Sequence, residues 1–149
     1  MAWWLKTSGS GDSPHLAPDW AARLASWRGR YGSVSMFPRR PRIERGDRLV
    51  SYAAGSHREF GESRIFLVEE VLSDEPEPGP HDRWPWLVHT RPLIAGPGLD
   101  RCPEITEIGI VRRSLGRHSH VRLSDEQGER AAALIARAAA DHGALVLRS

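Results

Sequence analysis

The 149-residue chain is poor in features that would place it in several large protein classes. Cys102 is its single cysteine, which excludes a disulfide within the chain and a zinc cluster built from cysteines. It has no apolar run near the ~20 residues that a membrane-spanning helix needs, and its first residues lack a signal-peptide pattern. We therefore expect a cytoplasmic protein that has no membrane contact and needs no metal or cofactor.

Lysine is also nearly absent, because Lys6 is the only lysine among the 21 Lys and Arg residues. The planar fork of arginine suits phosphate groups and stacked bases. A GC-rich bacterial genome, whose codons favour arginine and alanine, explains the same bias without any function. The net charge is only +2, so the placement of the charges carries more information than their sum.

The charges are spread unevenly along the chain. Residues 28–48 hold seven arginines against Glu44 and Asp47, whereas residues 69–82 hold six acids and no Arg or Lys. This pattern is typical either of two solvated loops or of one face that attracts an anionic polymer and another that repels it. The predicted phosphate-binding residues are Arg28, Arg30, Arg39, Arg40 and Arg42.

Length and composition predict one domain over residues 1–149, with a real hydrophobic core. Strands are expected where β-branched and aromatic residues gather, at 2–7, 48–54, 64–73, 84–91, 107–113 and 118–123. Residues 33–45, 75–80 and 92–104 are expected to be irregular because prolines interrupt them. Pro85 is expected at a strand start, an edge or a bulge.

Two helices complete the predicted secondary structure. Apolar residues at i, i+4 and i+7 indicate a helix over 18–29. The other helix is expected over 124–142, where Ser124 and Gln127 have the spacing of a capping box and Gly143 follows as a stop. The strands and helices together predict an α+β fold in which five or six short strands close into a barrel.

The order of these segments resembles the EVE domain family of the PUA-like superfamily, whose relatives include the YTH and ASCH domains. Trp3-Trp4-Leu5-Lys6 resembles the aromatic first strand of the family with its lysine. Residues 46–52, Gly-Asp-Arg-Leu-Val-Ser-Tyr, resemble its glycine–aspartate turn and following strand. Residues 84–91 stand where the family has a Trp-bearing strand, and Leu123-Ser124 with the following helix resembles its C-terminal element. The resemblance implies a PUA-like twisted five- to six-stranded β-barrel flanked by helices.

The chain departs from the family at two places that bear on the base it reads. Thr7-Ser8-Gly9 stands where the family has a Glu-Pro pair, and residues 31–35 replace a Val-Arg-Asn stretch. The resemblance implies a non-catalytic module that reads one modified base, modified cytosine in DNA before others, while the YTH relatives read methylated adenine in RNA. The choice between DNA and RNA and the oligomeric state stay open.

A base presents two π faces and a hydrogen-bonding edge, so a pocket for it needs aromatic walls and a few polar groups. Neighbouring residues on a strand face opposite sides, so one of Trp3 and Trp4 at most lines the pocket, and the family position favours Trp4. A tryptophan in a small domain is otherwise a core residue. The predicted pocket residues are Trp4, Lys6, Trp27, Ser33, Ser35, Ser51, Tyr52 and Trp86. Of these, Tyr52 and Trp86 are expected to be central.

Two other functions fit the sequence. The ASCH relatives include small amidohydrolases of modified nucleosides that use a Lys with a Thr and a Glu, and Lys6, Thr7 and Glu69 or Glu70 resemble that set. A protein-interaction module that uses the proline-rich loop is the other alternative. His118 and His120 share a strand face, as metal ligands do, but surface histidines explain the pair better because no third ligand is evident.

Overall fold

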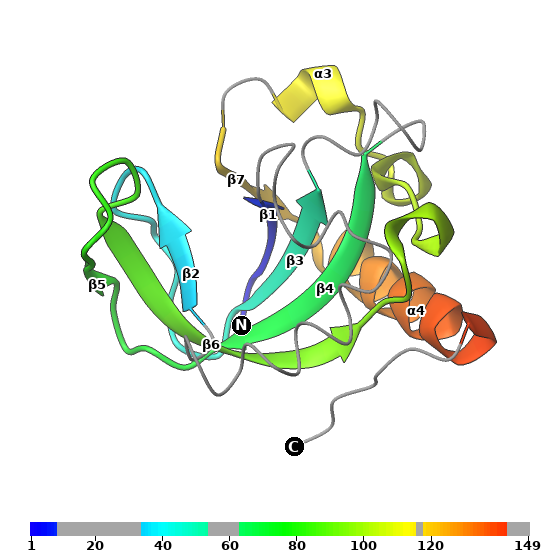
Figure 1. Cartoon of the computed structure of the whole chain (residues 1–149), viewed down its shortest axis with the longest axis horizontal. Helices are drawn as coiled ribbons and strands as arrows, with labels where there is room; N and C mark the ends of the chain where they lie inside the picture. The colour runs from blue at the N-terminus through cyan, green and yellow to red at the C-terminus, as the bar shows by residue number, and fades with distance from the viewer. Residues whose placement is uncertain (9–33, 54–62, 116–117, 143–149) are drawn as a thin grey trace.

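The computed structural model describes residues 1–8, 34–53, 63–115 and 118–142 (Figure 1). Within these ranges a mixed sheet curls round, and a long helix, α4 (Asp125–His142), lies against its outer side (Figure 1). No helix in the described ranges has both the length and the apolar character to cross a membrane. The predicted helix at 18–29 lies outside them, as do Trp27, Ser33, Arg28 and Arg30.

Seven strands form the described sheet. They are β1 (Trp3–Ser8), β2 (Val34–Phe37), β3 (Arg48–Ala53), β4 (Arg64–Val71), β5 (Glu77–Pro78), β6 (Trp86–Ala95) and β7 (His120–Leu123). Their order across the sheet is β2-β6-β4-β3-β1-β7, with β5 paired to β6. β1 and β3 run parallel and the other pairs are antiparallel. The expected α+β class with a twisted, barrel-like sheet and a C-terminal helix is therefore confirmed, with two-residue β5 raising the strand count.

Side-chain contacts across the interior show how far the sheet curls. Phe37 on β2 and His120 on β7 belong to strands at opposite ends of the sheet order. Their rings nevertheless lie 5.1 Å apart between centroids. Figure 1 shows β2 and β7 facing each other over the concave side of the sheet. The sheet is thus a half-barrel with an inner face and an outer face, and alternation along each strand decides which side chains each face receives.

The outer face forms the larger hydrophobic core. Trp3, Leu5 and Val50 of this face pack with Ala131 and Ile135 of α4. Each fully buried side chain of this size stabilises the fold by roughly 1.5–3 kcal/mol relative to exposure. The alternation that puts Trp3 and Leu5 here sends Trp4 and Lys6 to the inner face.

The start of α4 agrees with the capping box that the sequence predicts. The Ser124 N–H donates to Gln127 Oε1 at 3.0 Å, and the Gln127 N–H donates to Ser124 Oγ at 3.1 Å. These bonds satisfy backbone donors that the first helical turn leaves without partners. The predicted helix at 124–142 is confirmed.

The strand expected at 107–113 is wrong, because the chain forms the short helices η3 (Ile105–Ile108) and α3 (Arg112–Leu115) there. Gly109 ends η3 with φ 78°, a backbone conformation that glycine adopts readily. The Glu104 N–H donates to the Glu107 carboxylate at 2.8 Å and so caps the turn from its other end. Local capping therefore overrides the β-branched residues of this segment.

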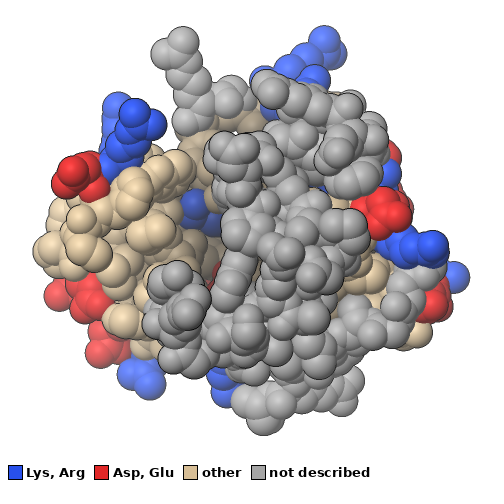
Figure 2. All heavy atoms as spheres, in the orientation of Figure 1, with Lys and Arg blue, Asp and Glu red and all other residues tan. Residues whose placement is uncertain are grey.

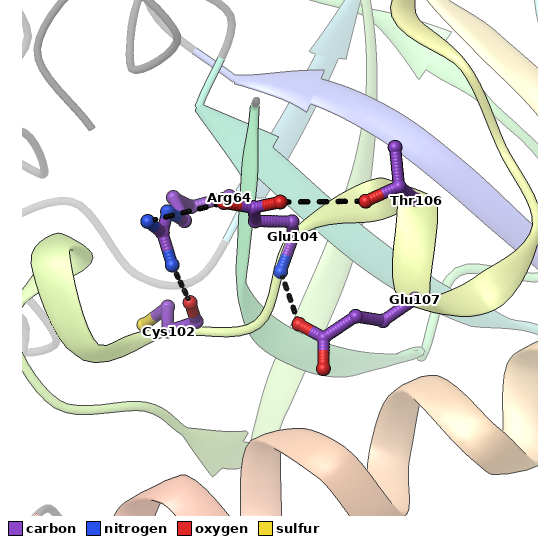
Figure 3. A network of polar contacts seen from close by, with 5 residues as sticks. All are labelled: Arg64, Cys102, Glu104, Thr106 and Glu107. Atoms are coloured by element: carbon purple, nitrogen blue, oxygen red, sulfur yellow. Dashed lines mark hydrogen bonds and ion pairs between the residues drawn. The ribbon is translucent and has the colours of Figure 1, made fainter. Parts of the chain in front are cut away.

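A polar network attaches the same segment to β4 (Figure 3). Arg64 donates to the carbonyl oxygen of Cys102 at 2.7 Å and pairs with Glu104 at 3.3 Å. Thr106 Oγ1 lies 3.4 Å from the Glu104 carboxylate. The half-buried guanidinium thereby fixes the loop that contains η2 (Leu99–Arg101) and η3 at the end of the sheet.

Three segments that we expected to be irregular contain strands. β2 fits between residue 33 and Pro38, and β5 is a two-residue pairing inside the acidic loop. β6 starts after Pro85, as expected, but continues through Pro92 to Ala95. The register explains this continuation, because Pro92 pairs with Glu69 and Ile94 with Val68. Leu93 is the extra residue of a bulge, and a bulge is one of the few positions in a sheet that accept proline.

Gly128 allows α4 to approach the sheet closely, and we predict that Gly128→Ala destabilises the protein. A Cβ at this position would lie 2.2 Å from the ring atoms of Trp3. Overpacking of this kind costs about 1–3 kcal/mol, which exceeds the ~1 kcal/mol that alanine contributes to a helix. Thermal and urea unfolding should therefore show a lower stability.

Two variants separate crowding from helix propensity. Ala133→Gly on the exposed side of α4 should lose about 1 kcal/mol by propensity alone. Trp3→Leu combined with Gly128→Ala should recover part of the loss, because the smaller side chain makes room for the methyl group. A Gly128→Ala protein that is more stable than the wild type would contradict the crowding argument.

Candidate functional site

The inner face of the half-barrel gathers buried polar groups among aromatic rings. The register sets Lys6 beside Ser51 and Leu49 beside Glu69, so side chains from β1, β3 and β4 enter the same interior. Contacts from β2, β7 and the residues before β6 complete the group. We call this group the Lys6 site, and it consists of Trp4, Lys6, Ser35, Phe37, Ser51, Glu69, Trp84, Thr90 and His120.

The amine of Lys6 is the centre of the site. Its side chain is only 6% exposed, and its Nζ lies 5.0 Å from the ring centroid of Phe37 and 4.9 Å from that of Trp84. Nζ donates a hydrogen bond to the carbonyl oxygen of Thr7 at 2.6 Å. Burial lowers the pKa of Lys6 to about 8, against the opposing effect of the Glu69 carboxylate. The amine is therefore mostly protonated at pH 7 but close to the range in which it exchanges its proton.

Glu69 is the buried acid that faces this amine. Its side chain is 8% exposed and accepts a hydrogen bond from Thr90 Oγ1 at 2.6 Å. Burial raises its pKa, while the Thr90 hydroxyl and the charge of Lys6 act in the opposite direction. Glu70 cannot play this part, because it points to the other face and pairs with Arg91 at 3.2 Å. Of the two acids proposed for a Lys–Glu set, the structure brings Glu69 to Lys6.

Thr7 likewise points away from the site, since it follows Lys6 directly on β1. Its carbonyl contacts the Lys6 amine, but its side chain belongs to the opposite face. Thr90 takes the place that we assigned to Thr7, because it reaches Glu69 from β6. Sequence spacing alone gave no signal for this pairing, which joins residues far apart in the chain.

His120 closes the site from β7. Its ring lies 5.5 Å from that of Trp4 and 5.1 Å from that of Phe37, and its Nδ1 is 2.9 Å from Ser119 Oγ. Burial lowers its pKa, and the positive charges of Lys6 and His118 add to that effect. These effects favour the neutral form of the imidazole. Among the described residues, no group of three or more His, Cys, Asp or Glu side chains could hold a metal ion.

The Gly46–Asp47 turn holds Trp4 at the edge of the site. The indole Nε1 of Trp4 donates to the Asp47 carboxylate at 3.0 Å, which also accepts bonds from the N–H of Ala2 at 2.8 Å and of Glu44 at 3.0 Å. Gly46 has φ 88°, as such a turn requires. One buried carboxylate thus positions the first residues of β1 beside β3.

The other predicted pocket residues fall on both faces of the sheet. Ser35 and Ser51 are buried on the inner face. Tyr52 is a correction, because it belongs to the outer core with Trp3 and Ile135 and cannot line the same interior as Ser51. Trp86 packs against the inner cluster that includes Phe37, with the guanidinium of Arg40 5.2 Å from its ring centroid.

Sequence analysis missed Phe37, Trp84, Thr90 and His120 as site residues. Trp84 could have been found, since it lies two residues before Trp86 and shares its side of the chain. Phe37 lies in a segment that we expected to be irregular, and His120 was considered only as a metal ligand. Thr90 gave no sequence signal at all.

The described parts of the basic and acidic segments meet at the surface and do not form two separate faces, which was one of the two arrangements that the sequence allowed. Arg40 pairs with Glu75 at 3.5 Å and Arg45 pairs with Asp74 at 3.2 Å, so the two segments meet at the surface. Arg39 and Arg42 are exposed, and neither makes an ion pair within the described part of the chain. Their part in binding phosphate stays a prediction.

The space-filling view shows where the interior opens. The molecule is hollowed beside the tan lobe that corresponds to β2, β5 and β6, and atoms of basic side chains are visible at the bottom of the hollow (Figure 2). The interior of the half-barrel therefore has an approach from outside in this view.

The electrostatic link between Lys6 and Glu69 can be measured directly because Lys6 is the only lysine. We predict that Glu69→Gln lowers the pKa of Lys6 further below about 8, since it removes the negative charge that opposes the effect of burial. Selective ¹³C labelling of lysine gives one Cε signal, whose pH titration reports this pKa.

Glu70→Gln is the matched control, because it removes the neighbouring carboxylate from the opposite face. It should leave the pKa of Lys6 unchanged. An equal shift in both variants, or none in Glu69→Gln, would show that Glu69 does not act on the amine.

Comparison with other proteins supports the fold but assigns no activity. No protein-family model matches the chain, and no curated protein matches it at a significant level. The NMR structure of Rpa0253 from Rhodopseudomonas palustris matches with a TM-score of 0.55 and 19% identity, over 91% of this chain and 93% of that one. A hypothetical protein from Leishmania major matches with a TM-score of 0.53 and 14% identity, over 85% and 89% of the two chains. At such identities the similarity shows a shared half-barrel fold and nothing about function.

Proposed function

We propose that the protein is a non-catalytic nucleic-acid-binding module that holds one modified base, with modified cytosine in DNA as the first candidate, at the Lys6 site. The observation that supports this most is the position of the Lys6 amine between the rings of Phe37 and Trp84 on the inner face. A buried donor among aromatic rings, with a buried acceptor nearby, is suited to a flat heterocycle that presents both hydrogen-bond donors and acceptors.

The two ionisable groups match the edge of a cytosine. The Lys6 amine is a donor for the ring nitrogen N3 and the carbonyl O2, and the Glu69 carboxylate is an acceptor for the exocyclic N4 amine. Thr90 holds Glu69 in place through the 2.6 Å hydrogen bond. Because both groups are buried, a ligand that left either one unpaired would be penalised strongly.

The modification itself needs a further contact. Burying one additional methyl group contributes only ~0.8 kcal/mol, about a fourfold preference. A hydroxymethyl or similar polar group gains more if it meets a hydrogen-bonding partner. Ser35 and Ser51 are buried on the inner face and carry hydroxyls that suit this role.

The proposal predicts a preference for modified bases that depends on Lys6. Short single- and double-stranded oligonucleotides with unmodified, 5-methyl or 5-hydroxymethyl cytosine, or with N6-methyl adenine, are titrated with wild-type protein. Lys6→Met should remove the preference, because the variant keeps the length of the side chain but not the donor. Trp84→Leu and Trp86→Leu should weaken binding by roughly 1–3 kcal/mol wherever the ring stacks on the base.

Tyr52→Phe is the control, because it removes only a hydroxyl group on the outer face. It should bind like the wild type. If the wild type binds every oligonucleotide equally, the protein does not recognise a modified base and the proposal is wrong. If a folded Lys6→Met variant keeps the full preference, the modified base does not bind at the Lys6 site.

An amidohydrolase acting on a modified nucleoside is the second candidate, and the pair of Lys6 and Glu69 favours it. A pKa near 8 for the amine and a raised pKa for the acid are the kind of shifts that acid–base catalysis uses. The hydrogen bond from Thr90 to Glu69 also resembles the Lys–Thr–Glu combination of the ASCH amidohydrolases.

This candidate predicts that free N4-acetylcytidine and water are converted to cytidine and acetate. If neutral Lys6 is the base, the rate should rise with pH through about 8, because deprotonation produces the reactive form. Chromatography of the nucleoside with wild type, Lys6→Met and Glu70→Gln measures this. Product release that is lost only in Lys6→Met would favour the hydrolase, whereas nucleoside that is bound but unchanged at pH 9 would exclude it.

A further inference from the structure

A second basic segment lies close to the Lys6 site in the chain. Residues 108–124 contain four arginines, two histidines and no acidic residue. The segment forms α3 and β7, and β7 supplies His120 to the Lys6 site. Arg117 belongs to the same run but lies outside the described residues.

The described arginines of this segment are available to a ligand. Arg112, Arg113 and Arg122 are all exposed, and none of them makes an ion pair with another described residue. The guanidinium of Arg122 lies 5.4 Å from the ring centroid of Trp4 and so stands at the border of the site. The acids nearest in sequence, Glu107 and Asp125, lie before α3 and after β7 rather than within the segment.

The first basic segment differs in this respect. Arg40 and Arg45 are paired with Glu75 and Asp74. Such exposed pairs contribute little stability, typically 0–1 kcal/mol, but they place negative charge beside the arginines and reduce the field that a phosphate experiences. A polyanion therefore meets less opposing charge at α3 and β7 than at residues 39–45.

The backbone connects α3 and β7 directly to the strand that carries Lys6. The His118 N–H donates to the carbonyl of Leu115 at 3.0 Å, and the Thr7 N–H donates to the carbonyl of Ser119 at 2.8 Å. Along β7, His120 pairs with Lys6 and Arg122 pairs with Trp4. β7 is also at the end of the strand order, and Figure 1 shows α3 on the same side of the sheet as the start of β7.

We propose that α3 and β7, through the exposed Arg112, Arg113 and Arg122, bind the sugar–phosphate backbone next to the base held at the Lys6 site. This inference rests on the proposed function and adds the direction from which the nucleic-acid strand approaches. The occupant is a phosphodiester chain, because guanidinium groups bind phosphate oxygens with two parallel hydrogen bonds. The arginines supply affinity without sequence preference, and the interior supplies the choice of base.

The salt dependence of binding tests this surface. Arg112→Gln/Arg113→Gln and Arg39→Gln/Arg42→Gln each remove two exposed arginines that have no ion pair among the described residues, so their change in net charge is identical. Binding of a single-stranded oligonucleotide with one 5-hydroxymethyl cytosine is measured at several salt concentrations. Each lost phosphate contact should flatten the slope of log K against log salt by about 0.7 for a single strand. We expect a change of up to about 1.4 in Arg112→Gln/Arg113→Gln and a smaller one in Arg39→Gln/Arg42→Gln, because the acids paired with Arg40 and Arg45 reduce the field beside that segment.

The outcomes separate this inference from the proposed function. Suppose that the modified base is preferred and the preference depends on Lys6, but the salt slope of Arg112→Gln/Arg113→Gln is unchanged. Phosphate binding by α3 and β7 is then wrong, whereas base recognition at the Lys6 site is supported. A flattened slope in the Arg39→Gln/Arg42→Gln protein alone, or equally in both, also overturns it. A flattened slope in Arg112→Gln/Arg113→Gln alone, with no preference for any base, would support phosphate binding by these arginines. It would contradict the recognition of a modified base at the Lys6 site. No binding by the wild type overturns both.

Free 5-hydroxymethyl deoxycytidine provides an independent check. It carries no phosphate, so Arg112→Gln/Arg113→Gln should bind it as tightly as the wild type does. A parallel loss of nucleoside binding in that variant would mean that the substitutions disturb the Lys6 site itself, and it would overturn the assignment of the arginines to the backbone.

Discussion

The interior of the half-barrel depends on one amine and one carboxylate that are kept out of water together. Removing two ions from water costs several kcal/mol each, and their mutual attraction offsets this cost only when further hydrogen bonds assist. Lys6 has a carbonyl oxygen and two aromatic rings around it, and Glu69 has the Thr90 hydroxyl. Replacing the pair with apolar side chains would be an easier way to fill a core. Its presence is one reason why we propose a ligand whose polar edge completes the set.

The curl of the sheet covers these two groups. A flat sheet would expose Lys6 and Glu69 on one face, because α4 covers only the other. Curling brings Phe37 and His120 from the two ends of the strand order over the amine. The Asp47 turn supports this arrangement at the edge, since it fixes Trp4 and the start of β1 with three hydrogen bonds. The same contacts that bury the charged pair thus shape the face on which a ligand can lie.

Rules that use only neighbouring residues, such as helix capping and strand alternation, predicted much of the fold and about half of the residues of the Lys6 site. The capping box at Ser124 gave α4, and alternation along β1 correctly separated Trp3 from Trp4. The same rule should have excluded Tyr52, which follows Ser51 directly and must face the other way. What no local rule could give is the meeting of β2 with β7 or of Thr90 with Glu69, because these contacts depend on how far the sheet curls and on the bulge at Leu93. The strand expected at 107–113 failed because Gly109 and the Glu104 turn outweigh β propensity there.

The placement of charge suggests how a reader built on this fold would divide its two tasks. Attraction to phosphate acts over a Debye length and does not distinguish bases. It is therefore best carried by exposed arginines such as those of α3 and β7. Discrimination requires groups that lose more when a ligand fails to match them, and only buried donors and acceptors have that property. The four-residue strand β7 contributes to both phosphate attraction and base discrimination. His120 lies beside the buried amine, and Arg122 reaches the surface beside Trp4. His120 and Arg122 lie on the same face of β7, and because β7 stands at the end of the strand order, the long side chain of Arg122 can reach the surface while His120 stays next to the buried amine.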